Sequence, residues 1–470
     1  MSMYSEFPAS YPSKFMLSVK KLAGGMNRQT IKILPDRTTC EPNGIMTFRM
    51  PLGAIVDLES LMWYFKVTDS GTSPLTCGRN ASNFIKRLSV NINNVSTMII
   101  NDYNLVHNIY SDFHNKDKSK SFLSAPQLAD VEYSEGAGAS GIVAISAKSG
   151  VKADITGLSS TQFVVDNWIG ILNSLSTPIV NTDLFGEVSI QIQIAPLQEC
   201  VAMVGGDTYA NESFQITDSY MTIQALSFTD DSYYQSLSSR ENLYYSFNDY
   251  IVTRFASVAK NTGINVTNYI SAGSIDHILG TAVFNETTPT RIVNYFGDGD
   301  GGTTASNIGS LSEVRADAIG KVDSVGTSNN GDLFNNVKAL QRNLQHLDKS
   351  VFSINNKQLN YAPLNIYEVY QNNLTMLNNL NIDASANGFH EGCLSIYHLF
   401  KYYAFHLQAL NLEDPDTAYI SGLNTSGASA SINWACTFTG SSNTLSIVPV
   451  MITKLTKVLK VGRGRQISVY

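Results

Sequence analysis

The sequence predicts an all-β protein built from two related halves. Three observations support this class: period-2 alternation is the dominant hydrophobic pattern, helical periodicity is rare, and one strand–turn–strand motif occurs twice. The composition agrees, because 43% of the residues are apolar and only 15% are charged, with abundant Tyr, Phe, Asn, Ser and Thr. A chain of 470 residues exceeds what one hydrophobic core usually holds, so two large domains are expected.

Several segments alternate apolar and polar residues in the manner of half-buried strands. The clearest is VSIQIQIAPL, in which Val188, Ile190, Ile192 and Ile194 share one face. The same alternation predicts further strands within residues 45–52, 59–67, 218–228, 432–440 and 445–459. Many strands joined by polar turns are typical of sandwiches and barrels.

Helices and long loops are expected as additions to this β framework. Helical spacing is confined to residues 335–347 and 365–377, which predicts short connector helices. The stretches at about 115–165 and about 284–335 lack periodicity and are predicted to be long loop excursions, one from each half. A polar, turn-rich segment places the domain boundary near residue 240.

A repeated motif supports the division into two halves. SVNINNVSTMIINDYNLVHNIY (89–110) and SVFSINNKQLNYAPLNIYEVYQ (350–371) each predict a strand, an Asn-Asn turn, a short strand and a helix. The matched positions are Ile92, Asn93 and Asn94 with Ile354, Asn355 and Asn356, and Tyr110 with Tyr370 after a two-residue shift. The second helix is expected to open just after Pro363. The copies lie about 260 residues apart, which favours duplication over two unrelated hairpins.

Segments spread along the chain also carry a family resemblance. They are NGIMTFRMPLGAIVDLESLMWYFKV, FIKRLSVNINN, LFGEVSIQIQIAPL and the ending VLKVGRGRQISVY. In their order and pattern the sequence resembles the double jelly-roll major capsid proteins of tailless icosahedral double-stranded DNA viruses, the lineage of Polinton-like viruses, virophages and nucleocytoplasmic large DNA viruses. The resemblance implies an N-terminal arm (1–30) and two tandem eight-stranded jelly rolls (31–240 and 241–470).

The same resemblance implies a structural function. The chain would be the major capsid protein of a virion shell, made and assembled inside the host cell as pseudo-hexameric homotrimers. Its partners would be neighbouring capsomers, penton proteins and minor capsid proteins, and the excursions would form outward towers that meet the host surface. Two alternatives remain open: a minor capsid or vertex protein, and a carbohydrate-binding β-sandwich protein.

Charge is unevenly distributed along the chain. The net charge of -7 argues against a surface built wholly for nucleic acid, but both ends are basic. The candidate inner-surface contacts are Lys20, Lys21, Lys454, Lys457, Lys460, Arg463 and Arg465. In a shell protein they would meet genome DNA or an inner membrane. The alternative is that Lys and Arg protect a strand edge from aggregation.

The sequence predicts no enzyme. The five cysteines form no CxxC pair, and neither a GxxxxGK[ST] phosphate loop nor a GxSxG elbow occurs. GDGDGG fails the calcium-loop spacing, because Gly309 stands where the bidentate Glu would be. His390, His398 and His406 recur every eight residues, a spacing that builds no metal site. We therefore expect no catalytic, cofactor-binding or metal-ligating residues. The absence of a long apolar segment favours a soluble protein.

Overall fold

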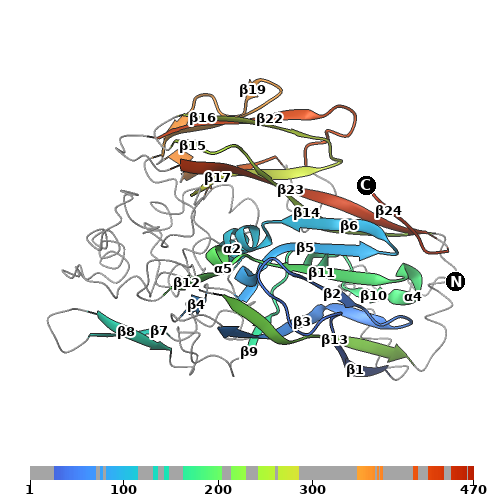
Figure 1. Cartoon of the computed structure of the whole chain (residues 1–470). Helices are drawn as coiled ribbons and strands as arrows, with labels where there is room; N and C mark the ends of the chain where they lie inside the picture. Colours follow the sequence, from blue (N-terminus) through green and yellow to red (C-terminus); the bar gives the residue numbers. More distant parts are fainter. Residues whose placement is uncertain are drawn as a thin grey trace.

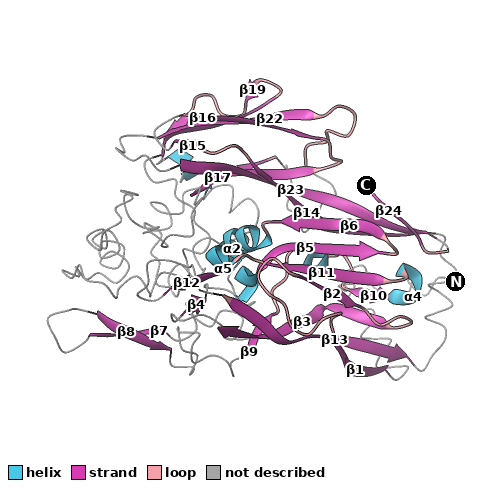
Figure 2. Cartoon of the chain, in the orientation of Figure 1, coloured by secondary structure: helices cyan, strands magenta, loops and turns pink. Residues whose placement is uncertain are grey.

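The computed structural model describes most of the strands that the sequence predicts. It covers residues 26–69, 75–77, 81–114, 131–135, 142–147, 162–203, 213–228, 242–259, 263–284, 347–365, 368–369, 371–373, 406–410, 422–438, 446–462 and 464–470. Antiparallel sheets dominate this part of the protein, and the helices are few and short (Figures 1 and 2). The domain boundary predicted near residue 240 lies outside the described residues.

Two sheets form the first half. One has the order β1 (Met26–Ile33), β13 (Phe214–Phe228), β3 (Ile55–Asp69) and β10 (Ile179–Asn181), with β9 (Gln162–Val165) also paired to β3. The other has the order β2 (Ile45–Arg49), β11 (Val188–Ile194), β5 (Ile85–Ile92) and β6 (Val95–Asn101). Two small ribbons are formed by β4 (Leu75–Cys77) with β12 (Val201–Met203), and by β7 (Val131–Glu135) with β8 (Ile142–Ala147).

Short helices close the ends of these sheets. They are η1 (Ala81–Phe84), α2 (Tyr103–His114), α3 (Ile171–Ser174), α4 (Thr182–Phe185) and α5 (Leu197–Cys200). Figure 1 shows α2 and α5 at one end of the β5–β6 pair and α4 near the opposite end. None of the helices within the described ranges is long and apolar enough to cross a membrane.

The second half also consists of two sheets. One has the order β14 (Asn242–Arg254), β23 (Ser446–Gly462), β17 (Ile275–Phe284) and β21 (His406–Ala409), and β15 (Val258–Ala259) and β24 (Gln466–Val469) pair with β23. The other has the order β16 (Ile264–Ile270), β22 (Ala430–Phe438), β18 (Leu347–Ile354) and β19 (Lys357–Gln358), and β20 (Leu364–Asn365) pairs with β18.

The two halves share one strand order. The path β2-β11-β5-β6 corresponds to β16-β22-β18-β19, and β1-β13-β3 corresponds to β14-β23-β17. Among the strands in the described ranges, none before residue 229 pairs with one after residue 241. Each half therefore forms its own pair of sheets, as the duplicated motif predicts.

The Asn-Asn turns are the same in both halves. Each joins two paired strands, and both central residues have a positive φ: Asn93 (49°), Asn94 (63°), Asn355 (51°) and Asn356 (63°). Two such residues define a type I′ turn, whose twist matches that of a hairpin and which Asn tolerates well. The first Asn N–H donates to the neighbouring central strand in each case, Asn93 to Glu187 O (2.7 Å) and Asn355 to Ser431 O (2.9 Å).

The predicted alternation decides what is buried. In β11 the four apolar residues are buried and the polar residues between them are partly exposed, as predicted. In β3 the residues Leu61, Trp63, Phe65 and Val67 are all fully buried. They join an aromatic cluster in which the ring of Phe65 lies 4.2 Å from Trp63, 5.5 Å from Phe84 and 5.6 Å from Phe163.

The first predicted excursion contains strands as well as loop. Three strands fall within 115–165, the stretch predicted to be a loop excursion: β7, β8 and β9. In β9, Phe163, Val164 and Val165 are all buried, so this short strand shows no alternation that a sequence pattern could reveal. The remainder of that excursion, and residues 285–335 of the second one, lie outside the described residues.

The predicted helices of the second half also differ in detail. Leu347 was assigned to a helix, but it pairs with Phe438 and begins β18, while residues 335–346 lie outside the described part. The helix expected just after Pro363 does not begin there, because Leu364 and Asn365 pair with β18, and the first described helical residue is Glu368. Asn365 and Glu368 then form a reciprocal capping box with bonds of 2.8 and 3.0 Å. The matched Tyr370 lies outside the described residues.

Candidate functional site

The main site is the junction where the two halves meet. Strand β14 packs against β6 and α3, and β24 packs against β6. Figure 1 shows β14 and β24 beside β6. Tyr245, Phe247 and Leu459 of the second half belong to the same buried cluster as the core of the first half. The other face of the same sheet contributes Met451 and Leu455 to a separate core. Burial on both faces explains why β23 carries the nearly unbroken apolar run IVPVMI.

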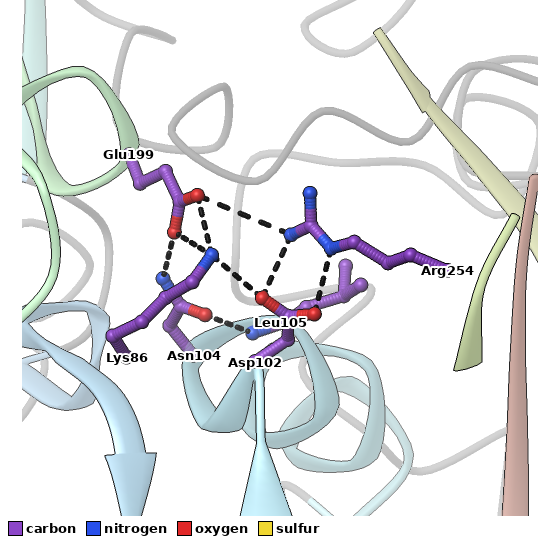
Figure 3. A network of polar contacts seen from close by, with 6 residues as sticks. All are labelled: Lys86, Asp102, Asn104, Leu105, Glu199 and Arg254. Atoms are coloured by element: carbon purple, nitrogen blue, oxygen red, sulfur yellow. Dashed lines mark hydrogen bonds and ion pairs between the residues drawn. The ribbon is translucent and has the colours of Figure 1, made fainter. Parts of the chain in front are cut away.

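A charged network crosses this junction (Figure 3). Arg254 of β14 binds the carboxylate of Asp102, at the start of α2, through Nε (2.6 Å) and Nη2 (2.8 Å). Lys86 of β5 lies 2.6 Å from the same carboxylate and 2.5 Å from Glu199 of α5. Asn104 completes the network by donating to Glu199 (3.2 Å). The bidentate Arg–carboxylate geometry fixes both the distance and the orientation of the two halves.

The network is charged at neutral pH. Burial acts to raise the pKa of Asp102, but the charges of Lys86 and Arg254 and their hydrogen bonds outweigh it and hold that pKa below its usual value. Burial likewise acts to lower the pKa of Arg254, and the bond and charge of Asp102 raise it instead. Asp102 also precedes the first turn of α2, where a negative charge is favourable. The link therefore holds as an ion pair.

A second link is aromatic and buried. The Tyr110 hydroxyl of α2 is hydrogen-bonded to His277 Nε2 of β17, and its ring lies 4.8 Å from that of Tyr250 in β14. Burial raises the pKa of both Tyr110 and Tyr250, so the two hydroxyls stay protonated. This contact positions α2 against the sheet of the second half.

Further links run along the length of the junction. Asn248 N–H donates to Ser174 Oγ (2.8 Å), and Ser176 N–H donates to Ser246 O (2.9 Å). At the far end, Arg465 Nε donates to the carbonyl of Asp183 in α4 (2.9 Å). These links recur at intervals along β14 and next to β24, so the two halves are held together at several points.

The structure places four of the predicted inner-surface residues. Lys454 Nζ lies 3.9 Å from Asp276 and its side chain is only 13% exposed, while Lys457 Nζ lies 2.6 Å from Asp249. Lys460 lies 5.9 Å from the ring centroid of Tyr244 and Arg465 binds the first half. Lys20, Lys21 and Arg463 lie outside the described residues. Each of the four placed residues thus has a partner within the chain.

Sequence reasoning missed the acidic partners of these residues. Asp249 and Asp276 are buried carboxylates, and they pair with Lys457 and Lys454, two of the candidate phosphate or lipid contacts. A signal existed, because FNDYIV and GSIDHIL each place an acid inside an apolar run. Such an acid needs a buried cation, and the basic C-terminal strand supplies one.

The described residues contain no constellation suited to chemistry. Two Ser–His pairs exist, Ser82 with His107 and Ser350 with His406, at 2.8 Å each, but all four side chains are buried. A small cavity between the sheets of the first half is lined by apolar side chains and Thr182. Within the described ranges no three His, Cys, Asp or Glu side chains gather as a metal site would require. The arrangement can hold surfaces in position, and we derive no reaction from it.

Comparison with known proteins agrees with this architecture. No protein-family model and no curated protein matches the chain. Among solved structures, PBCV-1 VP54, fitted into a reconstruction of the virophage Sputnik, matches with a TM-score of 0.57 at 10% identity over 95% of this chain and 97% of that one. The Faustovirus major capsid protein matches with a TM-score of 0.54 at 10% identity, covering 93% and 91% of the two chains.

A third match is the virophage Sputnik, determined by cryo-EM, with a TM-score of 0.53 at 10% identity and coverage of 95% and 89%. These structures belong to the class of double jelly-roll major capsid proteins. The chain is all-β and has their double jelly-roll fold, as its sequence predicts. At such low identity the likeness defines the fold, and it extends over both halves.

Proposed function

We propose that this chain is a major capsid protein, a structural subunit of an icosahedral virion shell. The observation that carries the proposal is the likeness in fold over nearly the whole chain to capsid proteins of this class. The fastened junction fits it, because a shell subunit must present both jelly rolls in a fixed relation to its neighbours. Fold alone does not determine function, so the proposal needs a direct test.

The proposal includes the organisation inferred from the sequence. After an arm over residues 1–30, the two jelly rolls would occupy 31–240 and 241–470. The pairing of strands supports this division, although β1 begins at Met26, so the sheet takes up the last residues of the arm. The excursion at about 115–165, apart from the buried strand β9 at its end, and the excursion at about 284–335 would form the outward towers and would meet the host surface.

The proposed partners are copies of the chain itself. Homotrimers with a pseudo-hexameric outline would contact neighbouring capsomers, penton proteins and minor capsid proteins. The basic residues would add a contact to genome DNA or to an inner membrane. Two complete jelly rolls favour the major protein over a minor capsid or vertex protein. The carbohydrate-binding alternative has less support, because the cavity between the sheets of the first half is lined by apolar side chains and Thr182.

The test is the state of assembly of the purified full chain. Size-exclusion chromatography with light scattering should give a trimer, and negative-stain images should show particles with a hexagonal outline. A stable monomer at micromolar concentration would contradict the proposal. Glycan-array binding by that monomer would favour the carbohydrate-binding alternative instead.

The polyanion contact needs a separate test. Neutralising Lys454 or Lys457 would leave Asp276 or Asp249 buried without its cation, so a loss of binding there would report on folding. A better variant replaces Lys20, Lys21 and Lys460 with Gln. Lys457→Gln is the control, because it shows how binding changes when the loss of an ion pair lowers stability. Weaker, salt-dependent binding of DNA or anionic vesicles by the first variant is expected. If the first variant binds both DNA and anionic vesicles as the unchanged protein does, this part of the proposal is wrong.

A further inference from the structure

The core of the second half contains a buried histidine with an incomplete set of hydrogen bonds. His406 of β21 is fully buried, and its Nδ1 lies 2.8 Å from Ser350 Oγ of β18. The same hydroxyl oxygen accepts the Trp434 Nε1–H of β22 at 2.9 Å. The imidazole also packs against the ring of Phe352, with 4.8 Å between centroids. His406 thus links β21 directly to β18 and, through the Ser350 hydroxyl, to β22.

The second ring nitrogen decides how this histidine responds to protons. His406 Nε2 is buried and finds no hydrogen-bond partner in the part of the chain that the structure describes. The neutral ring leaves only this one atom unsatisfied. The imidazolium must bear a hydrogen on both nitrogens, and it would add a full charge to a site with no acceptor at Nε2. The folded site therefore holds the neutral ring.

The first half contains a matched histidine that lacks this defect. His107 Nδ1 lies 2.8 Å from Ser82 Oγ, and its Nε2 lies 2.6 Å from the carbonyl of Asn167. A carbonyl only accepts, so Nε2 carries the hydrogen of the neutral ring. On protonation, Nδ1–H can donate to Ser82 Oγ, and both N–H groups of the imidazolium then have acceptors. The two buried Ser–His pairs therefore differ at Nε2, which has an acceptor in His107 and none in the described surroundings of His406.

Within the part of the chain that the structure describes, no charged side chain offsets the burial of His406. Among the side chains that the structure describes, the titratable ones on the surrounding strands are Asp276 and His277 (β17), Lys349 (β18), Cys436 (β22), and Lys454, Lys457 and Lys460 (β23). Asp276 is held by Ser274 and Thr456, and His277 is bonded to Tyr110. Burial raises the pKa of the Cys436 thiol, so that it stays neutral. Burial is also the cause that lowers the pKa of His406 to about 3.

We propose that the Ser350–His406–Trp434 cluster makes the second half an acid-sensitive element, which opens around β18, β21 and β22 on mild acidification while the first half stays folded. In the opened form His406 meets water and takes up a proton near its ordinary pKa of about 6.5. In the closed form His406 stays neutral, because it is buried and its Nε2 has no acceptor in the described part of the chain. The ratio of opened to closed molecules therefore rises about tenfold for each pH unit below about 6.5.

Hydrogen exchange measured by mass spectrometry on the full chain tests this inference. Exchange would be compared at about pH 7.5 and about pH 5.5, after correction for the intrinsic pH dependence of the chemistry. Peptides from β18 and β22 should lose about tenfold of protection per pH unit, and peptides from β5 and β11 should lose none. Equal loss in both halves, or no loss in β18 and β22, would overturn the proposal.

Two variants identify the responsible group. His406→Gln keeps a polar side chain that does not titrate, so the pH dependence of β18 and β22 should disappear, whereas His107→Gln should leave it unchanged. If His406→Gln does not fold, Trp63→Phe with Trp168→Phe leaves Trp434 as the only tryptophan of the 470 residues. Its emission should then shift to the red as the pH falls below about 6.5. Constant emission down to about pH 4 would contradict the role of the cluster.

Discussion

The two halves share one order of strands but fill the space between their sheets differently. In the first half, Trp63 stacks on Phe65, and Phe84 meets Phe65 edge-on, so that the three rings form a continuous aromatic cluster. In the second half, Trp434 donates to Ser350, which is also bonded to His406, and its ring lies so close to Gly280 that a Cβ there would come within 2.6 Å of it. Strand order and alternation thus specify the fold, while the chemistry of each core is free to diverge.

Truncating the aromatic cluster should have the largest effect. Trp63→Ala removes a fully buried ring and its hydrogen bond to Ser219 (2.8 Å), and we expect a loss of about 3–5 kcal/mol in the free energy of unfolding. Urea denaturation followed by circular dichroism measures it. Trp434→Phe retains much of the ring and should lose about 1–2 kcal/mol through its bond to Ser350. A loss for Trp63→Ala no larger than that for Trp434→Phe would contradict the packing of the aromatic cluster.

Breaking the junction should have the next largest effect. Asp102→Asn removes the carboxylate shared by Lys86 and Arg254, and we expect a loss of about 2–3 kcal/mol in the free energy of unfolding. The exposed Lys66–Asp218 pair (2.8 Å) is the matched control, and Asp218→Asn should change stability by less than about 1 kcal/mol. Similar effects from the two variants in thermal unfolding would show that the junction pair contributes no more than a surface pair.

Acid should affect the junction and the second half in different ranges of pH. The folded-state pKa of Asp102 is lowered, so its contribution is present above the unfolded pKa of about 3.9 and is lost only as the pH falls below that value. The folded-state pKa of His406 is also lowered, to about 3, so the unfolded state binds more protons between there and about 6.5. Stability should fall by about 1.4 kcal/mol per pH unit across that interval.

Denaturant titrations at a series of pH values measure this slope. His406→Gln should flatten it between about pH 6.5 and pH 4, while Asp102→Asn should leave that part unchanged. A slope that survives in His406→Gln would assign the acid sensitivity to another group. The pH profile thereby separates the junction from the core of the second half.

How far the sequence predicts this molecule depends on whether the determining contacts are local. The alternation of β11 and the Asn-Asn turns are local signals, and both were read correctly. Strand β9 was missed, because burial of both its faces removes the alternation. The junction was missed as well, since Asp102 and Arg254 lie 152 residues apart and only the fold brings them together. The partners of the basic C-terminal strand were hidden for the same reason.

The duplicated turns allow the most direct comparison of the halves, and substitutions there should change stability the least. Asn94 and Asn356 have the same φ of 63°, and Gly at the second position of a type I′ turn removes the strain of a side chain there. Asn94→Gly and Asn356→Gly should each raise stability by a few tenths to about 1 kcal/mol, as measured by thermal unfolding. If one variant were more stable and the other less stable than the unchanged protein, only one of the two turns would have this geometry.

The first Asn of each turn should respond differently, because the two have acquired different contacts. Asn93 donates to the carbonyl of Arg465, across the junction, whereas Asn355 accepts from Ser431 within its own sheet. Asn93→Gly should therefore weaken the hold of the first half on Arg465, and Asn355→Gly should loosen only the pairing with β22. Faster hydrogen exchange in β24 for the first variant alone would show that one copy of a duplicated turn now serves the junction.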